Sequence, residues 1–213
     1  MTAAVTVIDY GSGNLLSVAR AFERCGSQAH LTHDPADIEN AERLVLPGVG
    51  AFGAGMQGLR ERGVIDAIRR FAASGRPLLG ICLGMQMLAS RSEEFGAHEG
   101  LGLVPGSVVA VPATDVDGSA QKTPHIGWAD LSPPAAGRWQ GTVFDGTAAG
   151  TSVYLVHSFH LVPDDPVHRL ADCFYGGHRI AAAVQSGPVI GCQFHPEKSG
   201  EAGLKLLAAF LRI

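Results

Sequence analysis

Short apolar runs in the first half of the chain alternate with segments in which apolar residues recur at helical spacing. The apolar runs predict buried strands at 5–9, 44–46 and 78–81. The helical spacing predicts helices at 15–25, 64–73 and 83–90. Strands that alternate with helices through glycine-rich turns are typical of a parallel α/β sheet.

The second half has a different pattern, in which most apolar segments have the length and composition of strands. These predicted strands are 108–111, 152–157, 168–175, 180–184 and 189–194. Gly176-Gly177 suits a hairpin turn, 199–211 suits an amphipathic helix, and the segments 114–122 and 132–149 suit loops. We therefore expect one domain over residues 1–213, with a doubly wound, mostly parallel sheet and an antiparallel extension.

Composition and charge exclude several classes of protein. Of the 213 residues, 46% are hydrophobic, which is enough for a large core, and a net charge of -4 without Lys or Arg clusters argues against a nucleic-acid or membrane partner. No apolar run approaches the roughly 18 residues of a membrane span. Residues 1–9 lack the basic region and cleavage site of a signal peptide, so we expect a cytoplasmic protein.

The cysteines give no sign of a metal site or of disulfides. Their positions are Cys25, Cys82, Cys173 and Cys192, and no two of them have metal-ligand spacing. Cys192 and His195 form a lone C-x-x-H pair, which is weak evidence for a metal. Disulfides are not expected in a chain without an export signal. We therefore expect no metal and no cofactor.

Cys82 lies in a segment with the form of a nucleophile elbow. It follows an apolar run, precedes a predicted helix and is flanked by Gly80 and Gly84. Small flanking residues permit the sharp strand-to-helix turn that lifts a nucleophile out of a sheet. At a helix N-terminus the dipole favours a thiolate, and the backbone N–H of Leu83 can face a developing oxyanion. The alternative is a buried structural cysteine, because free cysteine is among the most buried residue types.

His195 and Glu197 follow a predicted strand and are separated by Pro196. We expect the proline to keep the segment out of a helix, so that the two side chains point the same way from an extended backbone. A thiol, an imidazole and a carboxylate are the parts of a nucleophilic triad. A solvated surface pair is the alternative for His195 and Glu197 alone, but an elbow in the same chain favours the triad.

Pro47-Gly48-Val49-Gly50 follows another predicted strand at the same presumed sheet edge. Two glycines let the backbone approach a ligand or rotate a peptide. The segment therefore suits a second oxyanion donor, the Val49 N–H, and the alternative is an ordinary turn between a strand and a helix.

Three motifs together resemble the triad-type, class I glutamine amidotransferases: G-I-C-L-G-M-Q at 80–86, P-G-V-G-A-F at 47–52 and Q-F-H-P-E-K-S at 193–199. The resemblance covers almost the whole chain. D-Y-G-S-G-N at 9–14, P-H-I-G-W at 124–128 and Y-L-V-H-S-F at 154–159 are similar to the branch that serves imidazole glycerol phosphate synthase. Met85 also fits this branch, whereas the anthranilate synthase branch usually has His there.

The resemblance implies a role for each matching residue. The implied catalytic residues are Cys82 as nucleophile, His195 as proton shuttle and Glu197 as its orienter, with Leu83 and Val49 as oxyanion donors. The implied substrate pocket is lined by Gly50, Gln86, Ser158 and Phe159. Phe159 departs from the family, which commonly has Tyr there, so any contact through a hydroxyl is in doubt.

Residues Asn14, Trp128 and Lys198 are implied to lie near a synthase partner. Their spacing alone favours the alternatives, which are a helix N-cap, a core indole and a surface cation. The family's partner in this branch is a (β/α)8-barrel cyclase, which implies a 1:1 heterodimer.

The implied reaction converts L-glutamine and water to glutamate and ammonia through a Cys thioester. The ammonia would pass to the cyclase, which makes imidazole glycerol phosphate and an aminoimidazole carboxamide ribonucleotide in histidine biosynthesis. The alternatives are the amidotransferase subunit of another synthase, a non-catalytic regulatory subunit of the same fold, and a free-standing cysteine peptidase. The intact Cys82, His195 and Glu197 argue against the regulatory subunit.

Overall fold

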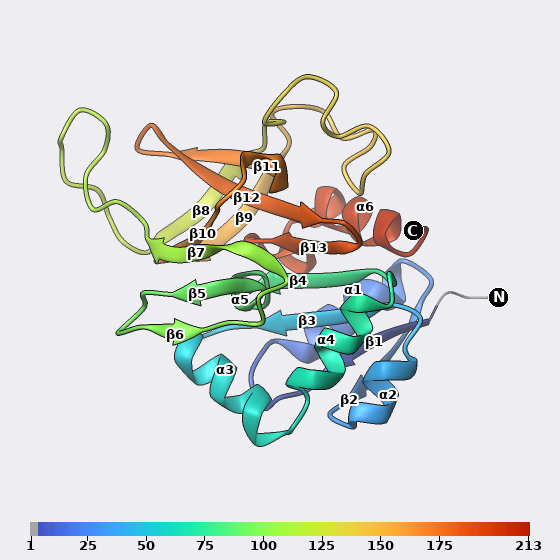
Figure 1. Cartoon of the computed structure of the whole chain (residues 1–213). Helices are drawn as coiled ribbons and strands as arrows, with labels where there is room; N and C mark the ends of the chain where they lie inside the picture. The colour runs from blue at the N-terminus through green and yellow to red at the C-terminus, as the bar shows by residue number, and fades with distance from the viewer. Residues whose placement is uncertain (1–3) are drawn as a thin grey trace.

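The structure is a computed structural model that describes residues 4–213. A seven-stranded sheet forms its centre (Figure 1). Its strands, from edge to edge, are β11 (Arg169–Tyr175), β12 (His178–Ser186), β13 (Val189–Cys192), β4 (Leu78–Cys82), β3 (Leu44–Gly48), β1 (Ala4–Ile8) and β2 (Gln28–Thr32). Neighbours from β13 to β2 pair in parallel, whereas β12 and β11 pair antiparallel. The mostly parallel sheet with an antiparallel extension is thus confirmed.

Helices cover both faces of this sheet. On one face lie α1 (Leu15–Arg24) and α6 (Gly200–Phe210), and on the other lie α2 (Pro35–Asn40), α3 (Phe52–Glu61), α4 (Ile65–Ala73) and α5 (Leu83–Met87). Successive residues of a strand point to opposite faces. In β3, accordingly, Val45 packs into the cluster below α1 and α6, while Leu44 and Leu46 pack into the other cluster. This arrangement confirms a doubly wound sheet.

Two smaller sheets flank the central one. Four strands make the first: β10 (Phe159–Pro163), β7 (Val104–Ala110), β5 (Ala89–Ser92) and β6 (His98–Glu99). The second is the antiparallel pair of β8 (His125–Asp130) and β9 (Ser152–His157). β9 and β10 follow each other through Ser158, so this connection lies between the two small sheets.

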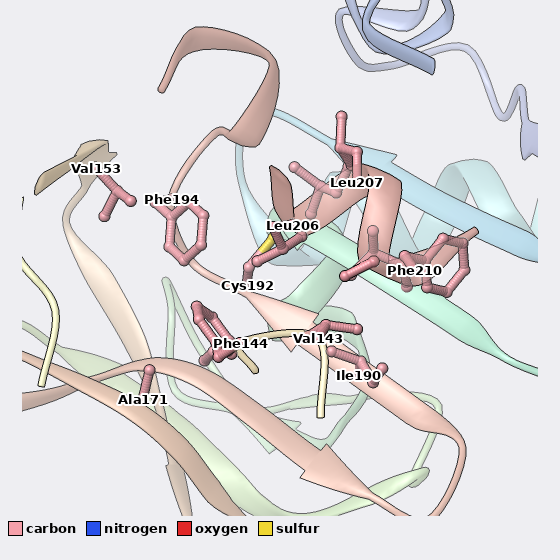
Figure 2. Packing of buried hydrophobic residues seen from close by; sticks show 14 of the residues in the cluster. Val143, Phe144, Val153, Ala171, Ile190, Cys192, Phe194, Leu206, Leu207 and Phe210 are labelled. Carbon is pink, nitrogen blue, oxygen red and sulfur yellow. The ribbon is translucent and has the colours of Figure 1, made fainter. Parts of the chain in front are cut away.

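The predicted loop at 132–149 has no helix or strand, yet it forms part of the core. Trp139, Val143 and Phe144 from this loop are buried. The Phe144 and Phe194 rings meet edge to face, with centroids 6.4 Å apart, a spacing typical of aromatic pairs. Figure 2 shows the two rings together, beside the α6 residue Leu206. The loop therefore anchors Phe194, the residue directly before His195.

The prediction of a helix over 83–90 is wrong at its C-terminal end. α5 ends at Met87, and β5 begins at Ala89. The backbone N–H groups of Leu101 and Gly102 donate to the carbonyls of Met87 and Ala89, so pairing with a distant segment ends the helix. Tertiary pairing overrides local helix propensity here.

Several elements carry no clear periodic signal and were not predicted. They are β2, α2, α3, β5, β6, β8 and β10. β2 is an edge strand with mostly exposed side chains, so its sequence Q-A-H-L-T lacks an apolar run. α3 has the sequence F-G-A-G-M-Q-G-L-R-E, with three glycines. Because glycine has low helix propensity, this sequence does not predict a helix.

Candidate active site

Cys82 ends β4 and stands at the N-cap of α5, as the elbow motif predicts. Its backbone has φ 55° and ψ -113°, a region that a residue with a side chain rarely adopts. The flanking glycines are required by close backbone approach, because a Cβ at Gly84 would fall on the Leu46 carbonyl and one at Gly80 would lie 2.8 Å from the Gly84 carbonyl carbon. The sharp turn therefore depends on both glycines.

His195 reaches the same sheet edge because β13 pairs in parallel with β4, with Cys192 beside Ile81. The backbone N–H of His195 donates to the Tyr154 carbonyl at 3.0 Å, which ties this segment to β9. Its side chain is only 3% exposed. Cys82 and His195 are 113 residues apart along the chain. The strand pairing brings both side chains to the same cavity.

The expectation of an extended backbone holds at His195, which has φ -98° and ψ 98°, but it is wrong at Glu197. Pro196–Lys198 form a 3-10 turn, in which proline takes the first position because its missing N–H is not needed there. The two side chains nevertheless meet, since Nδ1 of His195 lies 2.8 Å from Oε1 of Glu197. The Glu197 side chain is 1% exposed, so the pair is buried rather than solvated.

The electrostatics of His195 favour its protonated form. Burial alone would lower its pKa, but Cys82 and Glu197 outweigh burial and raise the pKa to about 9. Nδ1 contacts Glu197, while Nε2 is buried and has no hydrogen-bond partner that meets normal geometry. Nε2 is therefore available to exchange a proton with the neighbouring Cys82 thiol.

The other cysteines lie in different surroundings. Burial raises the pKa of the Cys25 thiol, raises that of Cys173 to about 12 and raises that of Cys192 well above its usual value. All four cysteines are free. Cys82 is the cysteine that lines a cavity with an imidazole beside it. Among residues 4–213, no group of three or more metal-ligating side chains lies together.

A cavity of about 300 Å³ opens in front of Cys82. It is lined by Val49, Gly50, Cys82, Leu83, Gln86, Glu94, Pro124, Val156, His157, Ser158, Phe159 and His195. Every residue predicted for the oxyanion donors and the substrate pocket is in this set. The volume is at the lower end of the range for small-molecule sites, which suits an amino acid.

Glu94 lines this cavity and was missed from the sequence. Its side chain is buried, and Oε2 accepts a hydrogen bond of 2.5 Å from the backbone N–H of Phe52 at the start of α3. Within the cavity wall it is a carboxylate without a lysine or arginine beside it. Glu93-Glu94 reads in the sequence as an exposed acidic pair, so only the fold reveals which of the two faces inward.

Val49 stands next to the elbow because β3 pairs with β4 with Gly48 beside Cys82. Gly48 packs so closely on α5 that a Cβ there would lie 3.0 Å from both Gly84 N and Leu83 Cβ. Ser12 Oγ donates a 2.8 Å hydrogen bond to the Val49 carbonyl, and Gly50 adopts φ 98°. The segment Pro47–Gly50 is therefore a tight backbone turn held from outside by Ser12.

Phe159 contributes its backbone to the cavity wall. Its carbonyl accepts a 2.9 Å hydrogen bond from Nε2 of Gln86, and its ring contacts Phe95 edge to face at 6.2 Å. A hydroxyl at this position is thus not needed to hold Gln86.

The three residues expected near a partner lie at the surface. Trp128 is 58% exposed, so the alternative of a core indole is wrong. Trp128 and Lys198 both contact Tyr154, with the Trp128 ring centroid at 6.0 Å and the Lys198 Nζ at 5.9 Å from the ring. Asn14 holds the N-cap position of α1, but its side chain makes no capping hydrogen bond. None of the helices within residues 4–213 is long and apolar enough to cross a membrane.

Comparisons with known proteins match this chain over nearly its whole length. The family model described as "Glutamine amidotransferase class-I" matches residues 6–213. A structure of PurLQS from Thermotoga maritima has a similar fold, with a TM-score of 0.75 and 23% identity, covering 100% of this chain and 99% of that chain.

Two curated relatives are more similar in sequence. Imidazole glycerol phosphate synthase subunit HisH 1 of Legionella pneumophila (strain Lens) is 52% identical over 211 residues, which is 99% of both chains. Subunit HisH of Syntrophotalea carbinolica is 46% identical over 209 residues, covering 97% of this chain and 98% of that protein. The chain belongs to the class I glutamine amidotransferase family.

Proposed function

We propose that this chain is the glutaminase subunit of imidazole glycerol phosphate synthase. Its relatives with that name match it over nearly their full length. The observation that carries the chemistry is the buried His195–Glu197 pair, with a 2.8 Å contact, beside the strained Cys82.

In the proposed first step, Cys82 Sγ attacks the side-chain amide carbon of L-glutamine. His195 Nε2 takes the thiol proton, and Glu197 at Nδ1 fixes the tautomer and stabilises the imidazolium. The carbonyl oxygen becomes an oxyanion, which the Leu83 N–H and the Val49 N–H stabilise. The carbon–nitrogen bond then breaks, and the nitrogen leaves as ammonia with the proton from His195.

The second step removes the acyl group from Cys82. His195 takes a proton from a water molecule, the hydroxide attacks the thioester carbon, and a second oxyanion forms at the same donors. The carbon–sulfur bond breaks, which releases glutamate and returns the proton to the cysteine. The net reaction is glutamine plus water to glutamate plus ammonia.

The amino-acid end of glutamine needs one anionic partner for its ammonium group. Glu94 is the buried carboxylate in the cavity wall, and we assign it this role. Gly50, Gln86, Ser158 and Phe159 supply the remaining polar and apolar wall. Because the Phe52 N–H occupies one oxygen of Glu94, the carboxylate is held in place for the ligand.

The ammonia acceptor belongs to a second subunit in this proposal. We expect a (β/α)8-barrel cyclase, bound as a 1:1 heterodimer, that contacts Asn14, Trp128 and Lys198. The exposed Trp128, 58% accessible beside Lys198, supports a protein partner at this surface.

A reconstitution experiment tests the proposal. The chain is mixed at 1:1 with the cyclase subunit, or with the synthase subunit of anthranilate synthase, and glutamine-dependent product formation is measured in each mixture. We expect imidazole glycerol phosphate only in the first mixture. Activity with the anthranilate partner alone, glutamine hydrolysis by neither mixture, or cleavage of peptides without any partner would each replace the proposal with one of its alternatives.

A further inference from the structure

A glutamine that the mechanism above does not use touches the reacting sulfur. Gln193 is fully buried, at 0% exposure, and its backbone N–H donates to the Ala182 carbonyl at 2.8 Å. Its side-chain Nε2 donates a hydrogen bond to Cys82 Sγ at 3.8 Å, within the range for sulfur. Gln193 does not line the cavity, so it approaches Cys82 from the protein side and not from the substrate side.

The direction of this hydrogen bond is fixed by its neighbours. Nε2 of Gln86 lies 2.9 Å from the Phe159 carbonyl, and a carbonyl can only accept, so the Gln86 group there is its NH2. The same nitrogen donates to Oε1 of Gln193 at 3.0 Å. The other end of the Gln193 amide is therefore its NH2, and this end faces the sulfur.

The Phe159 carbonyl accepts a second hydrogen bond, from His157. His157 Nδ1 lies 3.0 Å from the same oxygen, and its Nε2 lies 3.2 Å from His125 Nδ1. Burial lowers the pKa of His157 to about 4 against the opposing effect of the Phe159 carbonyl, so the imidazole is neutral at pH 7. Its one N–H must be on Nδ1, and Nε2 accepts from His125. Both lone pairs of the Phe159 carbonyl thus accept hydrogen bonds. The side-chain amides of Gln86 and Gln193 can therefore adopt only one orientation.

We propose that Gln193 stabilises the thiolate form of Cys82 and that Gln86 holds Gln193 in the donating orientation. A thiol is a weak acceptor, whereas a thiolate accepts strongly, so an N–H aimed at sulfur favours the charged form. The donor is buried and already oriented, so it does not have to reorganise during the reaction.

This inference rests on the proposed role of Cys82 as nucleophile, and it predicts an effect on both chemical steps. Thiolate is the attacking species in the first step and the leaving group in the second. Gln193 contacts the sulfur but not the cavity, so its loss lowers kcat for glutamine while KM stays within about twofold. A residue that only fills space in the core does not produce this split.

The test uses the 1:1 complex with the cyclase subunit. The rate of alkylation of Cys82 by iodoacetamide is measured against pH by mass spectrometry, for the unaltered chain and for Gln193→Leu. We expect the alkylation profile of the variant to move to higher pH, with about tenfold slower alkylation at pH 7, the size expected for one lost hydrogen bond to a charged group. Glutamine-dependent kcat falls by a similar factor.

Gln193→Glu is the second variant, because it has the same shape and keeps the acceptor for Gln86. Its carboxylate faces the sulfur and repels a thiolate, so its profile moves further than that of Gln193→Leu. Gln185→Leu is the matched control, since Gln185 lies on the adjoining strand β12 and its side-chain amide donates to the nearby Gly187 carbonyl. Calorimetric binding of each variant to the cyclase subunit reports whether the variant has folded.

The outcomes separate this inference from the proposed function. If the alkylation profile is the same for both variants and the unaltered chain, the inference is wrong, even when a glutamine analogue still labels Cys82. If the analogue does not label Cys82 in the unaltered chain, the proposed function itself fails. If Gln193→Leu does not fold, the isosteric Gln193→Glu decides the question by the direction of its shift.

Discussion

At Cys82 the backbone, and not only the side chain, distinguishes one thiol from three others. The other thiols sit in ordinary backbone conformations, and burial raises the pKa of each. Cys82 stands at φ 55° with an imidazole beside it and a cavity in front. Strain of this kind is found where the surrounding structure holds a reactive group in place.

Cys82→Ala tests the nucleophile. We expect loss of glutamine-dependent synthesis in the complex and unchanged ammonia-dependent synthesis, because Cys82 takes no part in the reaction of ammonia at the cyclase. Both rates are measured on the same preparation. A glutamine-like affinity label that modified Cys25, Cys173 or Cys192 and spared Cys82 would contradict the assignment.

His195→Ala and Glu197→Gln separate the base from its orienter. His195→Ala removes the proton acceptor, so we expect a loss of activity close to that of Cys82→Ala. Glu197→Gln keeps the shape of the side chain but removes the charge at 2.8 Å from Nδ1. The corresponding change in a serine triad costs on the order of 10⁴-fold, and we expect a smaller loss with a thiol nucleophile. Steady-state glutaminase assays of both variants give the comparison, and full activity of Glu197→Gln would make Glu197 a bystander.

Glu94→Gln tests the site proposed for the substrate ammonium group. The amide oxygen can still accept from the Phe52 N–H, so the start of α3 is preserved. The charge is lost, and a hydrogen bond to a charged group contributes roughly 1.5–3 kcal/mol, so KM for glutamine rises on the order of tenfold or more. Alkylation of Cys82 by iodoacetamide serves as the control, because that reagent has no ammonium group. A KM unchanged from that of the unaltered chain would remove Glu94 from the substrate site.

Among the secondary-structure elements, the end of β3 carries the second of the two oxyanion donors that we propose. Val49 lies between Gly48 and Gly50, and Ser12 holds the Val49 carbonyl from outside the turn. Glycine tolerates conformations that other residues do not, so the peptides around Val49 can rotate at low cost. The end of β3 is thus suited to control by a partner that contacts the nearby α1 N-terminus.

Val49→Pro removes the N–H that the oxyanion site is proposed to use. One oxyanion donor contributes roughly 10² to 10³ in rate. We therefore expect the glutaminase activity of the complex, measured with the substrate of the cyclase present, to fall by about that factor. Binding to the cyclase, measured by calorimetry, is retained. Ser12→Ala is the companion variant, and it leaves the Val49 N–H in place. If the Val49→Pro complex were as active as the unaltered complex under these conditions, the Val49 N–H would not be an oxyanion donor.

Elements with a strong apolar signal were predicted well, and those formed by tertiary contacts were not. The strand before Cys82 and the strand β9 at 152–157 were predicted because buried strands need continuous or alternating apolar residues. β5 was mistaken for the end of a helix, since its pairing partners lie in β6 and β7. The 3-10 turn at Pro196–Lys198 has no periodic signal, and only the structure shows how it brings His195 to Glu197.

The site residues that were predicted lie in sequence motifs, whereas the site residues that were missed are identified only by the fold. Cys82, His195 and Gln86 lie in motifs whose residue types indicate their chemistry. Glu94 has ordinary sequence surroundings, and Gln193 begins the motif that contains His195 but has no role assigned to it from the sequence. Each becomes a candidate only when its buried side chain is seen beside the cavity or the sulfur. Side-chain direction in irregular segments cannot be inferred from periodicity.

In the whole molecule, buried neutral histidines make the fold sensitive to acid. Burial lowers the pKa of His157 to about 4, and burial followed by the nearby Arg169 lowers that of His160 to about 4. These values lie below the usual 6.5, so between pH 6.5 and 4 the unfolded chain binds protons that the folded chain does not. The contribution of these two neutral histidines to stability is therefore complete above pH 6.5 and falls as the pH decreases through this window.

His160→Leu tests the acid sensitivity. One such histidine costs about 2 kcal/mol of the free energy of unfolding between pH 7 and pH 5. Chemical denaturation at the two pH values should show a smaller pH-dependent loss in His160→Leu than in the unaltered chain. His33→Leu, on an exposed residue, is the control. An equal loss in His160→Leu and the unaltered chain would mean that the fold does not lower the pKa of His160.

The position of β13 in the sheet has a consequence for how the protein is made. β13 is an internal strand, flanked by β12 and β4, although it follows all the other strands of residues 4–213 along the chain. A nascent chain that ends before β13 already carries Cys82 but has no base for it, and an unfilled gap separates β12 from β4. Proteins fold from the N-terminus as they emerge from the ribosome, and contacts this distant in sequence form slowly. Unfinished chains therefore release no ammonia, and activity arises in a single step when the last strand inserts.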